Sequence, residues 1–404
     1  MSRRISGLLL ICLTFACLPP QARSADDEEP SFLDKKLSHW LGLLETGKDA
    51  KTRAKGVLAI EMIGPASKKS LPALVKAMQD KETIVRKAAT RAVGRTIAKI
   101  VEEARSKKED PPRFDTARDA LAAALRTDKE PAVREAAALA IGDLGIEAKP
   151  VLGSLTQALK DKHAPTAKAA ASSMRRIGTA ARDAQAELQV LLADKKADKD
   201  ARTDAAIALG QIGADIKQAL PVLEEVLADA KAEATLRKAA ADSIGKMGKE
   251  AAEASASLGA VLVAKDSTIA LRLAAVNAID QIGPDAKAAI PALISAVADP
   301  VLIKTFGDDA RFIRGQAMHA LGQMGKELDK KRAEGVKAIL VASEDPSIEV
   351  CVAAIETLAA MYLDGYGGHQ EDVVKRLDAI IRREGRKAIR DAAETALAKI
   401  KPKK

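Results

Sequence analysis

The side chains of this 404-residue sequence best suited to chemistry are its histidines, one isolated cysteine and a recurring arginine. The histidines His39, His163, His319 and His369 are scattered, and none has the His-Glu-x-x-His spacing with which one helix face holds a metal ion. Cys351 is the only cysteine after residue 17, so it has no partner for a disulfide or for a cysteine-ligated zinc site. No nucleophile elbow and no glycine-rich phosphate loop occur either. These patterns favour a protein without a catalytic residue, a metal or a cofactor.

The arginine recurs in one local context, the run Val-Arg-Lys-Ala-Ala around Arg86, and its position is called the arginine slot below. At spacings of 33 to 48 residues, the slot holds Arg53, Arg86, Arg134, Ala167, Arg202, Arg237, Arg272, Arg314, Cys351 and Arg390. Alanine stands three residues after every slot but the first. The residues seven and ten positions after the slot are aliphatic or methionine, with Thr96 as the exception. Because these positions share one helical face, each slot begins an amphipathic helix.

A glycine eleven residues after most slots predicts where these helices end, because glycine readily takes the left-handed conformation of a helix C-terminus. A second helix follows, with Pro72, Pro221 or Pro291 near its start, and it ends at an aspartate such as Asp80. Aromatic residues make up only 2% of the chain and hydrophobic residues 47%, a composition that suits closely packed, alanine-rich helices. The sequence therefore predicts an all-α chain of helix–turn–helix units without strands.

The spacing of Pro72, Asp80 and Arg86 resembles the motif of HEAT repeats, particularly the short bacterial kind also found in phycobilisome-lyase-like proteins. The resemblance covers about residues 45 to 400 and implies an α-solenoid, a superhelix of about ten HEAT-like repeats. In this family the aspartates and arginines of neighbouring repeats form a hydrogen-bonded ladder. The resemblance therefore implies a structural role, and no active site, for Asp80, Arg86, Asp128, Arg134, Asp266, Arg272, Asp308 and Arg314.

The N-terminal segment predicts export. Two arginines precede the apolar run Ile5–Leu18, which is too short to span a bilayer comfortably. Small residues surround Ser24 and Ala25, where we expect cleavage of a signal peptide, residues 1–25, and lipid attachment at Cys17 is the alternative. The mature chain is then expected in the periplasm, at the cell surface or in the medium, as a monomer without a membrane span.

The rest of the chain divides into an acidic linker with an N-terminal capping helix, residues 26–44, and the repeat array, residues 45–404. The capping helix contains Trp40, the only tryptophan, which we expect to cover the first repeat because a solenoid end must be shielded. The first of three insertions predicts an extended helix followed by an exposed loop. Whether the insertions are functional or merely tolerated surface loops is open. They are residues 98–118, 300–310 and 364–369.

The resemblance also implies that the slot-bearing helices line the concave face. Positions one, five and nine residues after a slot lie about 140° from its apolar stripe, so they should be exposed together on that face. The residues at these positions form a basic cluster early in the chain, and in the later repeats several of them are amide side chains. The candidate residues for binding a partner are Lys87, Arg91, Arg95, Lys168, Arg176, Lys238, Lys246, Asn277, Gln281, His319 and Gln323.

The formal charge is +9; without the first 25 residues, 62 basic and 56 acidic residues remain, a net +6. This charge is small for the length, and few aromatic side chains are available to stack on bases. We therefore expect a non-catalytic scaffold that binds a protein or peptide outside the cytoplasm, with no small-molecule substrate. Two other classes stay open, an enzyme resembling HEAT-repeat lyases or hydroxylases and a binder of nucleic acid or another polyanion. A bound metal or chromophore would favour the first, and a steep salt dependence of binding the second.

Overall fold

The computed structural model describes residues 29–298, 309–324, 332–345, 347–363 and 370–400, and within these ranges the α-helices form ten consecutive pairs. The first helices of the pairs are α1 (Leu37–Thr46), α3 (Leu71–Ala77), α5 (Asp115–Thr127), α7 (Leu152–Ala158), α9 (Gln185–Ala193), α11 (Ile216–Ala228), α13 (Ser255–Val263), α15 (Ile290–Ala298), α18 (Arg332–Ala342) and α20 (Gln370–Arg383). The second helices, which carry the slots, are α2 (Ala50–Ile63), α4 (Thr83–Ser106), α6 (Pro131–Asp143), α8 (Ala164–Ile177), α10 (Lys199–Leu209), α12 (Ala234–Lys246), α14 (Ile269–Ile282), α17 (Asp309–Met324), α19 (Ile348–Leu363) and α21 (Lys387–Ile400).

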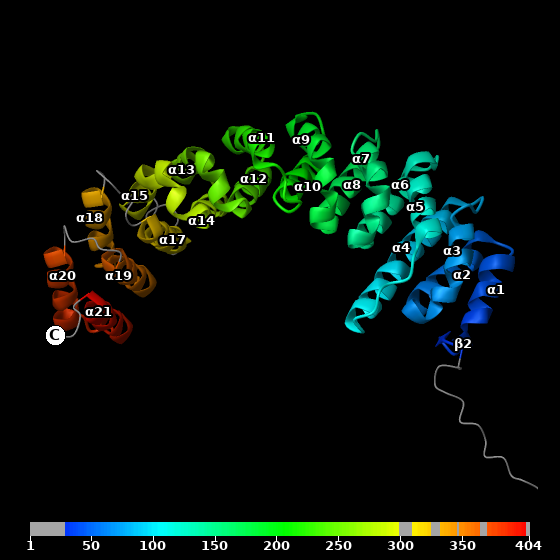
Figure 1. The fold of residues 1–404 in the computed structure, drawn as a ribbon, viewed down its shortest axis with the longest axis horizontal. Coiled ribbons are helices and arrows are strands. Elements are labelled where there is room, and N and C mark those ends of the chain that lie inside the picture. Colours follow the sequence, from blue (N-terminus) through cyan, green and yellow to red (C-terminus); the bar gives the residue numbers. More distant parts are fainter. Residues whose placement is uncertain (1–28, 299–308, 325–331, 346, 364–369, 401–404) are drawn as a thin grey trace, which may run out of the picture.

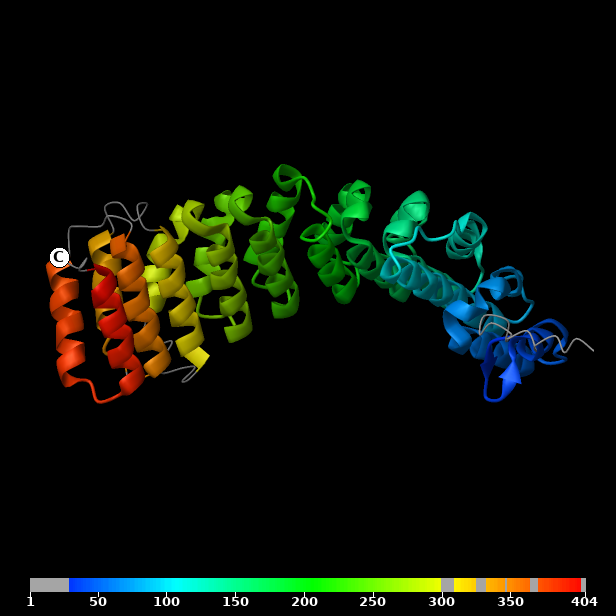
Figure 2. The same ribbon diagram turned by 60° about the horizontal axis from the view of Figure 1, so that its bottom comes forward.

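The pairs follow one arc, with the slot-bearing helices on its concave side and their partners on the convex side (Figure 1). Each of these inner helices packs against the next, from α2 to α21, so the inner layer is continuous. In a view turned by 60°, the pairs stand side by side along the length of the molecule (Figure 2). The expected all-α solenoid of about ten repeats is therefore confirmed.

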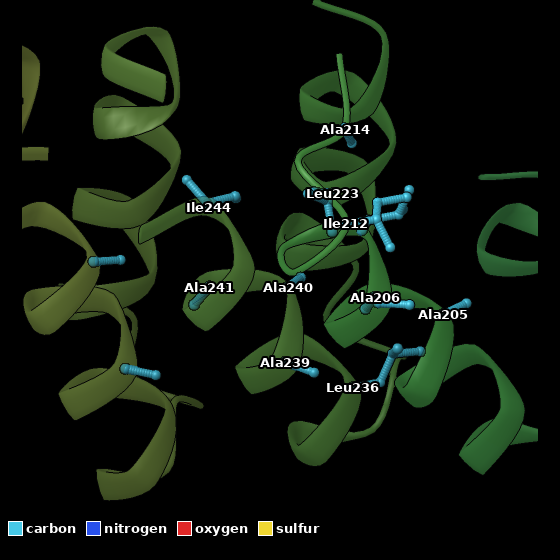
Figure 3. Close-up of a cluster of buried hydrophobic side chains, with 14 of the residues drawn as sticks. Ala205, Ala206, Ile212, Ala214, Leu223, Leu236, Ala239, Ala240, Ala241 and Ile244 are labelled. Carbon is cyan, nitrogen blue, oxygen red and sulfur yellow. The ribbon is translucent and has the colours of Figure 1, made fainter. Parts of the chain in front are cut away.

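Small side chains allow the inner helices to approach one another closely. Between α10 and α12, Ala205 and Ala240 are fully buried (Figure 3). Leu223 of the outer helix α11 is also fully buried in this cluster. One such close approach is at Gly94 of α4, where a Cβ would stand only 2.6 Å from the Cβ of Ala140 in α6. A large aromatic ring has no room between backbones this close, which accounts for the low aromatic content.

Glycines with positive φ end several inner helices, as the sequence predicts. The φ angle is 72° at Gly64, 67° at Gly178 and 76° at Gly283, a conformation that residues with a Cβ avoid. The sequence predicts only a turn after them. In the structure, short 3-10 helices follow, and alanines such as Ala181 are fully buried in them, so the connection is packed into the core. These 3-10 helices include η2 (Gly64–Ser70), η3 (Gly145–Val151), η4 (Gly178–Ala184) and η5 (Gly248–Ala254).

The N-terminal end differs from the sequence prediction. The sequence predicts only a linker and a capping helix over residues 26–44, but Phe32 lies in β1 (Ser31–Phe32), which pairs antiparallel with β2 (Lys35–Lys36). The prediction of a chain without strands is wrong here, because Leu33 and Asp34 both take positive φ angles and turn the chain back. Periodicity alone does not detect a hairpin this short.

Trp40 of α1 joins this hairpin to the array. Its Nε1 donates hydrogen bonds to the carbonyl oxygens of Phe32 and Lys35, both at 3.2 Å. The two rings of Phe32 and Trp40 lie 6.3 Å apart, and Trp40 packs against the buried core. Trp40 therefore holds the hairpin at the end of the first repeat.

The first insertion lengthens α4 to 24 residues, and α5 begins at Asp115 after an irregular segment, as the sequence predicts. Residues 300–308 of the second insertion, the third insertion and the predicted signal peptide lie outside the described residues. No helix in the described part of the chain is long and apolar enough to cross a membrane.

Candidate binding surface

The candidate binding residues all lie on inner helices, and none of them is buried. Because each inner helix repeats the register of the previous one, positions five and nine residues after the slot form rows along the concave side. The helices carry the candidates as follows: Lys87, Arg91 and Arg95 on α4, Lys168 and Arg176 on α8, Lys238 and Lys246 on α12, Asn277 and Gln281 on α14, and His319 and Gln323 on α17.

Most of the candidate cations on this surface are bonded to a carboxylate of the chain itself. Lys168 Nζ, for example, lies 2.6 Å from Asp200 Oδ2, and this bond lowers the pKa of the Asp200 carboxyl below its usual value. Three of the four pairs join consecutive inner helices and so connect neighbouring repeats. A partner's acidic groups would have to displace these internal carboxylates to reach the cations. The pairs are Arg95–Glu61, Lys168–Asp200, Arg176–Asp143 and, within α12, Lys238–Asp242.

The N-terminal part of the surface exposes cationic and apolar side chains together. Lys87 and Arg91 of α4 form no ion pair with any residue in the described ranges. Leu58 and Met62 of α2 are 53% and 61% exposed, and Leu139 of α6 is 37% exposed. These five residues are called the N-terminal inner patch below.

A hollow of about 330 Å³ lies beside this patch, between α4, α6 and α8. Arg91 and Arg95 line one side of it, and Glu135 and Asp143 line the other. Arg95 Nη1 also lies 2.5 Å from a carboxylate oxygen of the largely buried Glu61. The basic cluster that the sequence predicts is thus partly neutralised by acids of neighbouring helices.

Leu58 and Met62 are missing from the sequence-based candidates, although a signal for them exists. They stand five and nine residues after Arg53, the register of Arg91 and Arg95 after Arg86. The rows drawn from the sequence begin at the second slot, and extending them by one repeat includes both residues.

The C-terminal part of the surface carries a polar cluster. His319 Nδ1 lies 2.6 Å from Asp280 Oδ1, and Gln323 Nε2 donates to the same oxygen at 3.1 Å. A hollow of about 430 Å³ lies beside it, between α17 and α19, and Gly322 and Ala353 are among its lining residues. Within the described ranges, no group of three or more His, Cys, Asp or Glu side chains could hold a metal ion. The cluster supplies hydrogen-bond donors and acceptors next to small residues.

At the turns, the slot arginines form a ladder. Arg86 Nε and Nη2 donate to the two carboxylate oxygens of Asp128 at 2.8 and 3.1 Å, and Nη1 donates to the carbonyl oxygen of Asp80 at 3.0 Å. Each arginine bonded in this way joins the turn of its own repeat to the acid of the next, and such a pair is called a rung below. The same bidentate contact forms the rungs Arg53–Asp80 and Arg134–Asp161.

After the fourth repeat the arginines bind differently. Arg202 Nε and Arg237 Nε donate to backbone carbonyls ten residues earlier, at 3.0 and 2.9 Å. Arg272 also donates to carbonyl oxygens, including that of Ser267 at 3.1 Å. Acid contacts persist at Arg237–Asp266, 3.5 Å, and at Arg314–Asp345. Asp308 lies outside the described residues.

The bidentate rungs lower the pKa of their carboxylates, those of Asp80, Asp128 and Asp161. Burial alone would raise the pKa of Asp128, but hydrogen bonds from Arg86 and from the Glu130 amide outweigh it, and the pKa lies below its usual value. The hydrogen bond from Arg53 lowers the pKa of Asp80 in the same direction. These shifts come from structural ion pairs, which perturb a pKa without any catalytic role.

Cys351 occupies its slot at the start of α19, as the sequence predicts, and is fully buried. Its Sγ donates to the carbonyl oxygens of Asp345 at 2.9 Å and Ser343 at 3.3 Å. Burial raises the pKa of this thiol, the opposite of what a nucleophilic cysteine needs.

The stacked helix pairs and their ladder form an α-solenoid with the architecture of HEAT repeats. Residues 201–229, within α10 and α11, match the family model of the PBS lyase HEAT-like repeat. A search of curated proteins finds no match.

Solved structures with a similar fold include those of Kap121p and Kap95p. Kap121p bound to Pho4p superposes with a TM-score of 0.53 and 14% identity, over 90% of this chain and 41% of that one. Kap95p superposes with a TM-score of 0.54 and 12% identity, over 90% of this chain and 51% of that one. In that structure, Kap95p binding induces the switch loops of RanGDP to adopt the GTP-bound conformation. This chain thus spans about half the length of these proteins or less, and the likeness concerns the fold.

Proposed function

We propose that this protein is a non-catalytic scaffold that binds a protein or peptide partner along its concave face. The observation that carries the proposal is the continuous inner layer, in which the fifth and ninth residues after the slot are never buried in the ten repeats. Evenly spaced exposed rows suit an extended segment that contacts several repeats at once. The similar structures support this reading, since Kap121p is seen bound to Pho4p and Kap95p binds RanGDP.

The contact is centred on the N-terminal inner patch. Its apolar members gain about 25 cal/mol for each Å² that a partner covers, and its two cations are free to form charge-assisted bonds. Further along the surface, cations are already bonded to acids of the chain. The patch therefore fits a segment that presents apolar residues beside acidic ones.

Affinity capture with residues 26–404 as bait identifies the partner, and the dissociation constant of that partner then tests the patch. Reversing two cations, Lys87→Glu with Arg91→Glu, should weaken binding by tenfold or more, which corresponds to about 1.4 kcal/mol. Arg95 is spared because it neutralises the buried Glu61. A separate variant, Leu58→Ser with Met62→Ser, tests the apolar part.

The matched control carries the same charge change away from the slot-bearing helices, at the exposed Lys217 of α11 and Lys249 of η5. Lys217→Glu with Lys249→Glu should leave binding unchanged, and all variants should unfold at the wild-type temperature. Equal affinity of the patch variants and this control would show that the N-terminal inner patch is not the site.

We also propose that the protein acts outside the cytoplasm. The support is the N-terminal order of two arginines, the apolar run Ile5–Leu18 and small residues at Ser24 and Ala25. Cell fractionation and the mass of the mature N-terminus test it, and a chain starting near Ala25 in the exported fraction is the expected result. An intact chain in the cytoplasm would contradict export, and a lipidated Cys17 would replace cleavage near Ala25 by membrane attachment.

A further inference from the structure

The ladder has a gap at the fourth repeat, where alanine fills the slot. Ala167 of α8 has no guanidinium to offer Asp194, the acid at the equivalent position of the next turn. Asp194 is nevertheless oriented like its counterparts: its Oδ1 accepts from the Lys196 amide at 2.9 Å, as Asp128 Oδ1 accepts from the Glu130 amide at 2.9 Å. The carboxylate thus has the local contact of a complete rung.

The backbone acceptors of a rung are also present. Arg134 Nη1 donates to the carbonyl oxygen six residues before its slot, that of Asp128, at 3.0 Å. The carbonyls six and five residues before Ala167 are those of Asp161 and Lys162, and no donor within the described ranges bonds to either. A guanidinium at this place would meet the set of acceptors that Arg134 meets.

The space for a side chain is open as well. Ala167, Asp161 and Asp194 line a hollow of about 380 Å³. The equivalent hollow at the first rung, of about 570 Å³, has Arg53 and Asp80 in the corresponding positions of its wall. The fourth repeat therefore lacks the arginine side chain and retains the room around it.

The second slot without arginine shows that such a gap can be filled from elsewhere. Cys351 holds that slot, and the acid of its rung is Glu384. Arg386 donates to both carboxylate oxygens of Glu384, Nε and Nη2 each at 2.9 Å, and lowers the pKa of Glu384 to about 2. Within the described residues, no arginine or lysine bonds Asp194 in this way.

We propose that the hollow at Ala167 binds the guanidinium group of an arginine side chain from a partner protein. The arginine donates two parallel N–H groups to Asp194 and a third to the carbonyl of Asp161, as Arg134 does in its own rung. Arginine is selected over lysine because only the planar fork can reach both carboxylate oxygens at once. The hollow is lined by four acidic side chains, those of Asp161, Glu187, Asp194 and Asp198, and by three lysines.

This site lies at the turns, apart from the N-terminal inner patch, so it does not depend on the proposal for the concave face. Its test uses the chain from residue 26 to 404, deuterated and labelled with ¹⁵N, and a capped pentapeptide with one arginine between alanines. The Lys196 amide reports directly on Asp194 because it donates to the same carboxylate. We expect the arginine peptide to shift this resonance saturably, and the matching lysine peptide to bind at least tenfold more weakly.

Two variants and one control complete the test. Ala167→Arg should supply the missing rung, raise the temperature of unfolding and weaken the peptide response at least tenfold. Asp194→Asn should weaken the response by a similar factor. Asp183→Asn, at an exposed acid of η4, makes the same charge change and should leave it unaltered.

Several results would overturn the proposal. Undiminished peptide binding by Ala167→Arg, or equal binding of the lysine peptide, would show that the hollow does not recognise a guanidinium. A lower unfolding temperature for Ala167→Arg would show that an arginine does not fit between these acceptors. A Lys196 shift that grows with protein concentration alone would show that a second copy of the chain, and no separate partner, supplies the arginine.

Discussion

Replacing Arg86 by methionine tests whether the ladder stabilises the array. The side chains of Arg86 and Asp128 are only 8% and 9% exposed. The guanidinium makes two hydrogen bonds to Asp128 and two to the carbonyls of Asp80 and Lys81. Methionine keeps an unbranched apolar stem, so the variant removes the polar contacts and little of the packing. Asp128 is then left buried without its cation.

The expected loss follows from that stranded charge. Removing one partner of a buried ion pair costs about 3–5 kcal/mol, and we expect the lower end because the Glu130 amide still bonds Asp128 in the variant. Since repeats contact mainly their neighbours, the loss should be confined to α4 and α6. Adding Asp128→Asn removes the uncompensated charge and should recover about 1–3 kcal/mol.

Hydrogen exchange read by mass spectrometry measures this loss locally. Amides of α4 and α6 should exchange faster in Arg86→Met, and those of α14 should be unchanged. The control is Lys107→Met, which breaks the exposed pair Lys107–Glu103 and should have little effect. Exchange in α4 and α6 no faster than in this control would refute a stabilising ladder, and an equal effect in α14 would refute its locality.

The same variant has a defined pH dependence. The pKa of Asp128 is lowered in the folded protein, so the rung contributes fully above the unfolded value near 3.8 and is lost as the pH falls through the folded pKa. The difference in stability between wild type and Arg86→Met should therefore shrink below pH 4. A difference that stays constant from pH 7 to pH 3 would show that the lost stability does not come from the Asp128 charge.

Four further substitutions test local packing and hydrogen bonding. Gly94→Ala should lower the free energy of unfolding, measured in urea, by about 1–3 kcal/mol, because the new Cβ would stand 2.6 Å from the Cβ of Ala140. Gly153→Ala in α7 should raise it by about 0.5–1 kcal/mol, because a Cβ there meets no atom within 4 Å. The buried Cys351 thiol should react with a thiol reagent only after unfolding, and rapid labelling of the native protein would contradict this expectation. Cys351→Ser should keep the fold, because a hydroxyl can donate to the same two carbonyl oxygens. Trp40→Phe removes both hydrogen bonds to the hairpin and should speed proteolysis at residues 31–36, and an unchanged cleavage rate would mean that other contacts hold it.

The repeat fold could be predicted from the sequence because its determinants are local and periodic. A slot, an apolar stripe and a glycine eleven residues later are enough to place an inner helix and its end, as at Arg272 and Gly283. The β1–β2 hairpin was not predictable in this way, because it depends on two residues with left-handed φ and on a contact from Trp40. Nor does any pattern reveal the 3-10 helices, which form where small residues meet the core.

The exposure of the candidate surface was equally predictable, and its chemistry was not. Helical register sets which residues face out, so Arg91 and Arg95 are exposed as the sequence predicts. Their partners depend on how repeats stack: Arg95 meets Glu61 across 34 residues of chain, and His319 meets Asp280 across 39. The lengths of turns and insertions change these separations, so no fixed spacing identifies the acid that neutralises a given cation.

In a repeat array, a departure from the pattern carries more information about binding than the pattern itself. The slot arginines that bond acids and backbone carbonyls are explained by the ladder, and the rows of exposed residues by helical register. Leu58 and Met62 break the polar character of those rows, and each exposes apolar surface that contributes nothing to the core. Ala167 breaks the ladder while every acceptor of its rung is retained. Among the described residues, these two departures each leave an interaction unmade, and for that reason they are the places where we propose that a partner binds.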